Sequence, residues 1–174
     1  IAAAFGTGTD AFFNHNGSHF YFFNDTGDVN FTNRTDDGDI IFASDNGSGG
    51  TAEYYRLDGG DNINYFSKHI KVPDSVKIYA GSSQDLEIYH DSSNSYVDHV
   101  GTGDLILRTA SSGDDIFVRA MDDVFIQPKN GEAGVYVYSD GAVELYYDNS
   151  KKLETTSTGA TVTGTIESDS ITID

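Results

Sequence analysis

Short apolar segments rich in Val, Ile, Tyr, Phe and Thr recur along the chain, with clusters of Gly, Asn, Asp and Ser between them. Their spacing of roughly 8–12 residues is typical of an all-β protein whose strands are joined by tight turns. No segment shows the periodicity of an amphipathic helix over several turns. The segments predicted as strands are Phe20–Phe23, Asp39–Phe42, Val76–Tyr79, Leu86–Tyr89, Leu105–Leu107, Ile116–Val118, Val124–Ile126, Val135–Tyr138, Val143–Tyr146 and Thr161–Thr163.

Turn-forming sequences lie between several of these segments, which supports the all-β prediction. Asn and Asp tolerate the left-handed backbone region, and a following Gly adopts it at no steric cost. Tight turns are therefore predicted at Asn16-Gly17, Asp45-Asn46-Gly47, Asp58-Gly59, Asn130-Gly131 and Asp140-Gly141.

Many of the predicted strands are very short and carry apolar residues at consecutive positions, which is typical of strands buried on both faces. In two of them, apolar and acidic residues alternate. Because side chains of a strand point to opposite faces in turn, we expect Glu87 and Glu144 to face outward. The same alternation predicts buried side chains at Leu86, Ile88, Val143 and Leu145.

The sequence also repeats itself with a period of roughly 75–82 residues, and repetition at a fixed period favours an elongated array. We expect a first, more divergent unit at residues 1–79, a second at 80–157 and the start of a further unit at 158–174, in a chain that continues beyond both ends. The pairs that match at this period are Gly6–Asp10 with Gly81–Asp85, Thr26–Asp28 with Thr102–Asp104, Asp39–Phe42 with Asp115–Val118, and Asp58-Gly59 with Asp140-Gly141. A third fragment, Val143–Asp148, restates Leu86–Asp91.

Composition and net charge exclude several kinds of site and argue against several functions. The chain has 174 residues, no Cys and a net charge of −18. Without Cys, thiolate zinc sites, iron–sulfur clusters and disulfides are excluded. A surface this negative repels phosphate backbones, so nucleic-acid binding is not expected. No apolar run is long enough to span a bilayer, so membrane insertion is not expected either.

Two kinds of residue suggest metal ions. His15 and His90 occupy equivalent repeat positions. If three copies of the chain assemble about an axis, their imidazoles could meet there and bind a cation. Alternatively, each His is hydrogen-bonded in a turn. Three acidic clusters supply oxygen ligands of the kind that Ca²⁺ prefers, yet none follows the twelve-residue Asp-x-Asp-x-Asp-Gly loop. We favour the turn interpretation and expect no metal, cofactor or catalytic residue. The acidic clusters are Asp36-Asp37-Gly38-Asp39, Asp114-Asp115 and Asp122-Asp123.

Three segments carry a resemblance to a known family: Asp85–Ser95, Gly101–Leu105 and Val143–Ser157, the last continuing through Thr165. They resemble the repeats of bacteriophage tail-fibre and related virion-appendage proteins, especially those of phages that infect marine bacteria such as cyanobacteria. The resemblance covers residues 68–174, with a divergent copy at 5–43. It implies an elongated, intertwined homotrimeric β-fibre of the triple β-helix or β-prism type.

The same resemblance implies a structural and adhesive role. The chain would form a trimeric shaft that presents a receptor-binding tip to the host cell, and it would be found on the virion, extracellular after release. Its partners would be its own copies, other tail or baseplate proteins, and a glycan or protein receptor bound through the tip. We expect no enzyme. Two alternatives remain open at this point: a tailspike-like polysaccharide depolymerase, and a bacterial adhesin or filament of monomeric β-solenoid form.

Overall fold

The computed structural model describes residues 2–6, 10–170 and 172. Every described element is a β-strand, fourteen in all, and every pairing between them is antiparallel. The all-β prediction is therefore confirmed. No helix in the described part of the chain has the length and hydrophobicity needed to cross a membrane.

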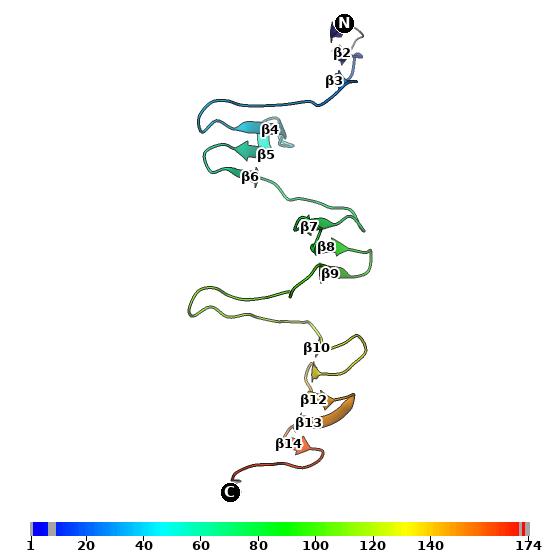
Figure 1. Ribbon diagram of the computed structural model, residues 1–174, viewed down its shortest axis with the longest axis vertical. Coiled ribbons are helices and arrows are strands. Elements are labelled where there is room, and N and C mark those ends of the chain that lie inside the picture. The colour runs from blue at the N-terminus through cyan, green and yellow to red at the C-terminus, as the bar shows by residue number, and fades with distance from the viewer. Residues whose placement is uncertain (1, 7–9, 171, 173–174) are drawn as a thin grey trace. The chain divides into compact units, whose positions relative to one another are not determined.

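The chain divides into two units, Ile1–Thr102 and Gly103–Asp174. The first unit holds three sheets, each a meander of three consecutive strands (Figure 1). The expected repeat boundaries at residues 79 and 157 come from sequence self-similarity, whereas these two units are defined by how the chain packs in space. The repeat boundaries therefore stay a prediction. The strands of the first unit are β1 (Ala2–Phe5), β2 (Ala11–His15), β3 (Phe20–Asn24), β4 (Ile40–Asp45), β5 (Thr51–Asp58), β6 (Ile63–Phe66), β7 (Ile78–Ala80), β8 (Leu86–His90) and β9 (Ser95–His99).

The second unit holds one five-stranded meander in the order β10-β11-β12-β13-β14. A β-bulge shifts the register between Leu145 and Tyr146 of β12. The strands of this unit are β10 (Val124–Ile126), β11 (Val135–Val137), β12 (Val143–Tyr147), β13 (Ser150–Thr156) and β14 (Gly159–Val162).

The predicted turns all connect neighbouring strand segments, as expected. Gly17, Gly47 and Gly131 adopt φ values of 101°, 79° and 79°, in the left-handed region that glycine tolerates best. In the β2–β3 turn, the Asn16 side chain accepts hydrogen bonds from the backbone N–H groups of Ser18 and His19. The local turn chemistry thus fixes where each meander reverses direction.

The β1–β3 and β7–β9 sheets share one three-stranded register. In the β1–β3 sheet Phe5 pairs with Ala11, and the corresponding pair in the β7–β9 sheet is Ala80 with Leu86. The β11–β12 pairing follows the same register, since Val135 pairs with Leu145 as Ile78 pairs with Ile88, but the bulge in β12 shifts its pairing with β13. The sequence similarities between these segments therefore correspond to one recurring meander.

Two predicted strands are wrong. Leu105–Leu107 and Ile116–Val118 do not join a sheet within the chain. Their apolar, β-branched composition suits a strand, but a strand needs a hydrogen-bonded neighbour, and no described segment of the same chain supplies one.

The predicted orientation of the two glutamates is also wrong. Glu144 is only 9% exposed, whereas Leu145 is 40% exposed and Ile88 is 44% exposed. Leu86 and Val143, which were also predicted to be buried, are half-buried. The physical reason is that Lys and Tyr side chains of the same sheet cover the glutamate face, while no described residue covers the aliphatic face. Ala133 is the only hydrophobic residue that is buried in the described part of the chain.

Candidate functional site: apolar rows and polar faces of the sheets

A row of aliphatic side chains crosses the β7–β9 sheet. Ile78 lies opposite Ile88, and Ile88 lies opposite Val97, so all three occupy one face. All three are exposed. A sheet of three short strands with one bare aliphatic face is marginal in water, so this face is a candidate contact surface.

A longer row of the same kind crosses the five strands of the second unit. Each member lies directly opposite the next, from β10 through to β14. The outer members are exposed, and the inner ones are at best half-buried. The row consists of Ile126, Val135, Leu145, Leu153 and Val162.

In the other two sheets the rows are aromatic. Phe13 of β2 stacks on Phe22 of β3 with ring centroids 4.8 Å apart. Across the β4–β6 sheet, Tyr55 lies between Phe42 and Phe66, with centroids 5.7 Å and 4.8 Å away. Four of these five rings are largely exposed. Each of the four described sheets therefore presents an apolar row that no described residue covers.

The opposite face of the β7–β9 sheet is polar and internally satisfied. Lys77 Nζ lies 2.5 Å from Glu87 Oε2 and 4.7 Å from the centre of the Tyr89 ring. The Tyr89 hydroxyl donates to Asp98 Oδ2 at 3.0 Å. The hydrogen bond to Glu87 raises the pKa of Lys77, and partial desolvation followed by the bond to Asp98 raises the pKa of Tyr89. These groups stabilise one another, which leaves few unpaired hydrogen-bonding atoms on this face for a ligand.

The second unit repeats this arrangement around Glu144. Its carboxylate accepts hydrogen bonds from the Tyr146 hydroxyl and, at 2.9 Å, from Lys151 Nζ, which also pairs with Glu154. The bonds from Tyr146 and Lys151 lower the pKa of Glu144. The bond to Glu144 raises the pKa of Tyr146 to about 12. Sequence analysis did not identify Lys77 or Lys151 as partners of the glutamates. A Lys placed diagonally across a strand pair from a Glu could have indicated such an ion pair.

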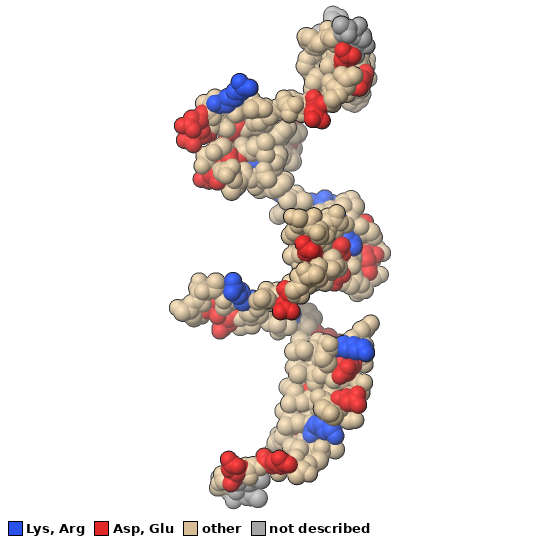
Figure 2. All heavy atoms as spheres, viewed as in Figure 1, with Lys and Arg blue, Asp and Glu red and all other residues tan. Residues whose placement is uncertain are grey.

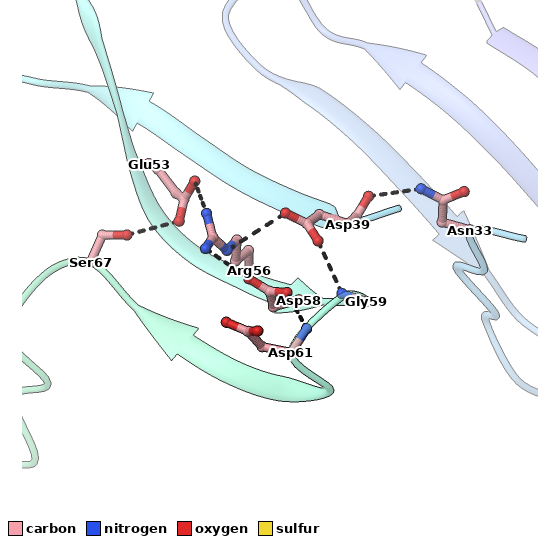
Figure 3. A network of polar contacts seen from close by, with 8 residues as sticks. All are labelled: Asn33, Asp39, Glu53, Arg56, Asp58, Gly59, Asp61 and Ser67. Carbon is pink, nitrogen blue, oxygen red and sulfur yellow. Dashed lines mark hydrogen bonds and ion pairs between the residues drawn. The ribbon is translucent and has the colours of Figure 1, made fainter. Parts of the chain in front are cut away.

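A third polar network centres on Arg56 of β5 (Figure 3). Its guanidinium lies 2.7 Å from Asp58, 3.6 Å from Asp39 and 3.7 Å from Glu53. Asp39 also accepts a hydrogen bond from the Gly59 backbone N–H. The network therefore ties the loop before β4 to the end of β5, and sequence analysis did not identify it.

Neighbouring hydrogen bonds engage the remaining carboxylate oxygens of this network (Figure 3). The Asp61 N–H donates to Asp58, and the Ser67 hydroxyl donates to Glu53. The bond from Asp61, followed by the charge of Arg56, lowers the pKa of Asp58. An open hollow of about 270 Å³ adjoins the network, and Asp58 is the one carboxylate among the residues that line it. Its ion pair with Arg56 and its lowered pKa make Asp58 a poor proton donor.

The residues considered as metal ligands take part in turns. The Gly17 N–H donates to His15 Nδ1 at 3.1 Å, and His90 Nδ1 lies 3.1 Å from Ser95 Oγ. The acidic cluster at 36–39 contributes Asp39 to the Arg56 network, and Asp123 accepts a hydrogen bond from the Ser139 N–H. Within the described residues, no three His, Asp or Glu side chains converge to hold a metal ion.

Charged side chains occupy a minor part of the visible surface of each unit, and most of that surface is formed by uncharged residues (Figure 2). Acidic residues outnumber basic ones by 28 to 10 in the sequence. Comparison with protein-family models, with curated proteins and with solved structures finds no match.

Proposed function

We propose that the chain is a shaft segment of a phage tail appendage, in which three copies intertwine and hold a receptor-binding tip toward the host cell. The observation that carries this proposal is the uncovered apolar row on every sheet. Ile88, Leu145 and Phe66 are each at least 40% exposed. Copies of the chain would cover these rows and would also give neighbours to the open strand edges.

The exposure of side chains within each unit supports the need for partners. Ala133 is the only buried hydrophobic residue among the described ones, and no described side chain is fully buried. Because so little apolar surface is buried within the chain itself, other molecules that cover the apolar rows would add much of the stability.

Among the functions considered, the shaft fits these features best. A monomeric β-solenoid stacks its strands in parallel ladders, whereas all pairings here are antiparallel. A depolymerase needs a cleft with an available acid and base, and the Glu144 and Asp58 carboxylates are instead engaged by Lys151 and Arg56. The resemblance of residues 85–95 and 143–157 to tail-fibre repeats favours a phage appendage over other fibres.

The mechanism of a shaft is mechanical and multivalent. Several fibres on one particle each contribute a weak contact through their tips, and linking them raises the effective concentration of every further contact. The shaft itself needs stiffness, regular burial and solubility. The repeated meander and the large negative charge are suited to these needs.

The oligomeric mass in solution tests the trimer. Three chains of 18.8 kDa would give about 56 kDa by light scattering. Ile88→Asp and Leu145→Asp place a charge within an apolar row, so we expect either variant to dissociate or aggregate. Ser83→Asp adds the same charge at an exposed turn and serves as the matched control. A stable, non-associating 18.8 kDa monomer would refute the trimer.

The appendage role is tested separately on virus particles. Antibodies raised against the purified chain should label thin projections of phage particles in electron micrographs. Labelling of a bacterial cell surface in uninfected cultures would instead favour the adhesin alternative. Release of reducing sugar from host polysaccharide would favour the depolymerase.

A further inference from the structure

Residues 104–120 form two arms that have no strand partner. After β9 the chain runs out in a long loop, reverses and returns to β10 (Figure 1). The turn between the two runs lies at residues 111–113. We name the outgoing run, residues 104–110, the first arm, and the returning run, residues 114–120, the second arm. The single hydrogen bond between them runs from the Thr109 hydroxyl to the Asp114 carbonyl oxygen at 3.1 Å. No backbone–backbone hydrogen bond connects either arm to another described residue.

Both arms have the composition of buried β-strands. Their centres, Leu105–Leu107 and Ile116–Val118, are continuous apolar runs, which is typical of strands covered on both faces. Here the same side chains are among the most exposed in the chain. Phe117 is 80% exposed, Val118 73% and Leu107 72%. Two runs with unpaired backbone and bare apolar side chains on both faces are unstable alone in water.

The charges at the ends of the apolar runs indicate what covers them. Residues 105–107 lie between Asp104 and Arg108, and residues 116–118 lie between Asp115 and Arg119. When two such segments pair antiparallel, the Asp of each lies against the Arg of the other. The complementary partner is therefore a segment with one acidic end, one basic end and a free strand edge. Another copy of this chain meets these conditions, since its own arms have the same charge pattern and lack neighbours.

We infer that the two arms form their β-ladder between chains, with the first arm of one copy pairing with the second arm of the next. This inference rests on the proposed trimer and specifies which segment intertwines its chains. Pairing unlike arms is a head-to-tail contact, and three such contacts close a ring. Within that ring each first arm adjoins a partner's second arm, and the apolar side chains of residues 105–107 and 116–118 turn toward a shared interior.

Amide hydrogen exchange of the intact protein tests this pairing. In the trimer, amides of residues 105–109 and 116–120 should exchange roughly 100-fold or more slowly than those of the turn at 111–113, because intermolecular hydrogen bonds protect them. A trimeric mass combined with arm amides that exchange as fast as the turn would overturn the inference and leave the proposed function intact. It would also indicate that some other molecule covers the arms. A monomeric mass would instead reject the proposed function itself.

Cysteine cross-linking identifies the paired arms, because the chain contains no Cys of its own. In variants that carry one Cys in each arm, such as Leu107→Cys with Val118→Cys, oxidation should give covalent trimers on a denaturing gel. Scanning the second position over residues 116–118 allows for the register. Each single-Cys variant should give at most linked dimers. Only intrachain disulfides across the scan, seen as monomers of altered mobility, would contradict pairing between copies.

A charge in the arm provides a further test of the exchange pattern. Phe117→Asp should abolish the protection of both arms, whereas Ser112→Asp places the same charge in the turn and should leave it unchanged. If the trimer of Phe117→Asp keeps protected arms, the side chain is not at the interface and the inference is wrong.

Discussion

At the residue scale, two glycines hold Asp85 at the start of β8. A Cβ at Gly101 would lie 2.6 Å from the Asp85 Cβ, and one at Gly81 would overlap the Asp85 carboxylate. Gly6 bears the same relation to Asp10 in the first sheet, and Gly6 and Gly81 have φ values of 88° and 90°. Close backbone approach explains why Gly and Asp recur together at this spacing in the repeat.

We expect Gly101→Ala to destabilise the protein by about 1–3 kcal/mol, because the methyl group must displace Asp85 and its backbone. Gly60→Ala is the matched control. Neither residue has a positive φ, and at Gly60 the added Cβ would meet only ordinary contacts at 3.7 Å or more. Chemical denaturation at fixed protein concentration measures both. Equal stabilities of the two variants would contradict the close approach.

Asp91 caps the β8–β9 turn and links stability to pH. Its carboxylate accepts hydrogen bonds from the backbone N–H groups of Asn94 and Ser93, at 2.7 Å and 2.9 Å, and from the Tyr96 hydroxyl at 2.9 Å. The bond from Asn94, followed by those from Ser93 and Tyr96, lowers the pKa of Asp91. A carboxyl with a lowered folded-state pKa stabilises the fold above its ordinary pKa, near 4, and this contribution disappears as pH falls through the folded-state value.

We therefore expect Asp91→Ala to lower the unfolding temperature at pH 7 by roughly 2–4 °C, because the turn loses its acceptor. Asp91→Asn should retain most of the stability at pH 7, since Asn16 makes the same contacts in the β2–β3 turn. Below pH 4 the difference between the native protein and Asp91→Asn should shrink. Melting curves from pH 3 to 7 check this, and a difference that is independent of pH would exclude the titration of Asp91.

At the element scale, the β12–β13 connection depends on backbone conformation more than on composition. Asp148 and Asn149 have φ values of 48° and 58°, which makes the connection a two-residue type I′ turn. The Asn149 side chain also accepts a hydrogen bond from the Ala133 N–H at 2.7 Å. The turn thus closes the hairpin and ties it to the chain just before β11.

Asp148→Val should destabilise the hairpin by about 1–2 kcal/mol, because a β-branched residue strongly disfavours a positive φ. Asp148→Gly is the control, since glycine adopts that conformation freely. Thermal melting of both variants at one protein concentration checks the prediction. It fails if valine is tolerated as well as glycine.

Local signals in the sequence predicted the fold wherever turn chemistry and strand composition agreed. Gly and Asn placed the reversals at 16–17 and 130–131, and the apolar alternation located β8 and β12. Strand β13 was missed because Ser150–Thr156 is mostly polar and forms a strand only through its pairing with β12. The predicted orientation of Glu144 failed because alternation identifies two faces but not which of them the chain itself covers.

At the scale of the whole chain, the sequence predicts a β-protein that is incomplete as a single copy. Its salt bridges among the described residues involve three basic side chains, Arg56, Lys77 and Lys151. The acidic partners of these three residues are a minority of the 28 carboxylates. Repulsion among the remaining acidic groups opposes assembly, while burial of the apolar rows favours it.

In the proposed trimer, this balance would make stability depend on salt. Three chains of −18 each would carry 3 × −18 = −54 in total. The Debye length falls from about 30 Å at 10 mM NaCl to about 4 Å at 500 mM, so high salt screens carboxylates on neighbouring copies from one another. We expect the unfolding temperature to rise across this range, and to rise further with millimolar Mg²⁺ or Ca²⁺. Adhesion to an anionic cell surface should increase under the same conditions.

The double variant Asp36→Asn/Asp37→Asn separates screening from a general salting-out effect. Removing two charges per chain should weaken the dependence on NaCl, whereas salting-out would leave it unchanged, and an unfolding temperature that is flat from 10 to 500 mM would show that the charges serve mainly to keep the protein soluble.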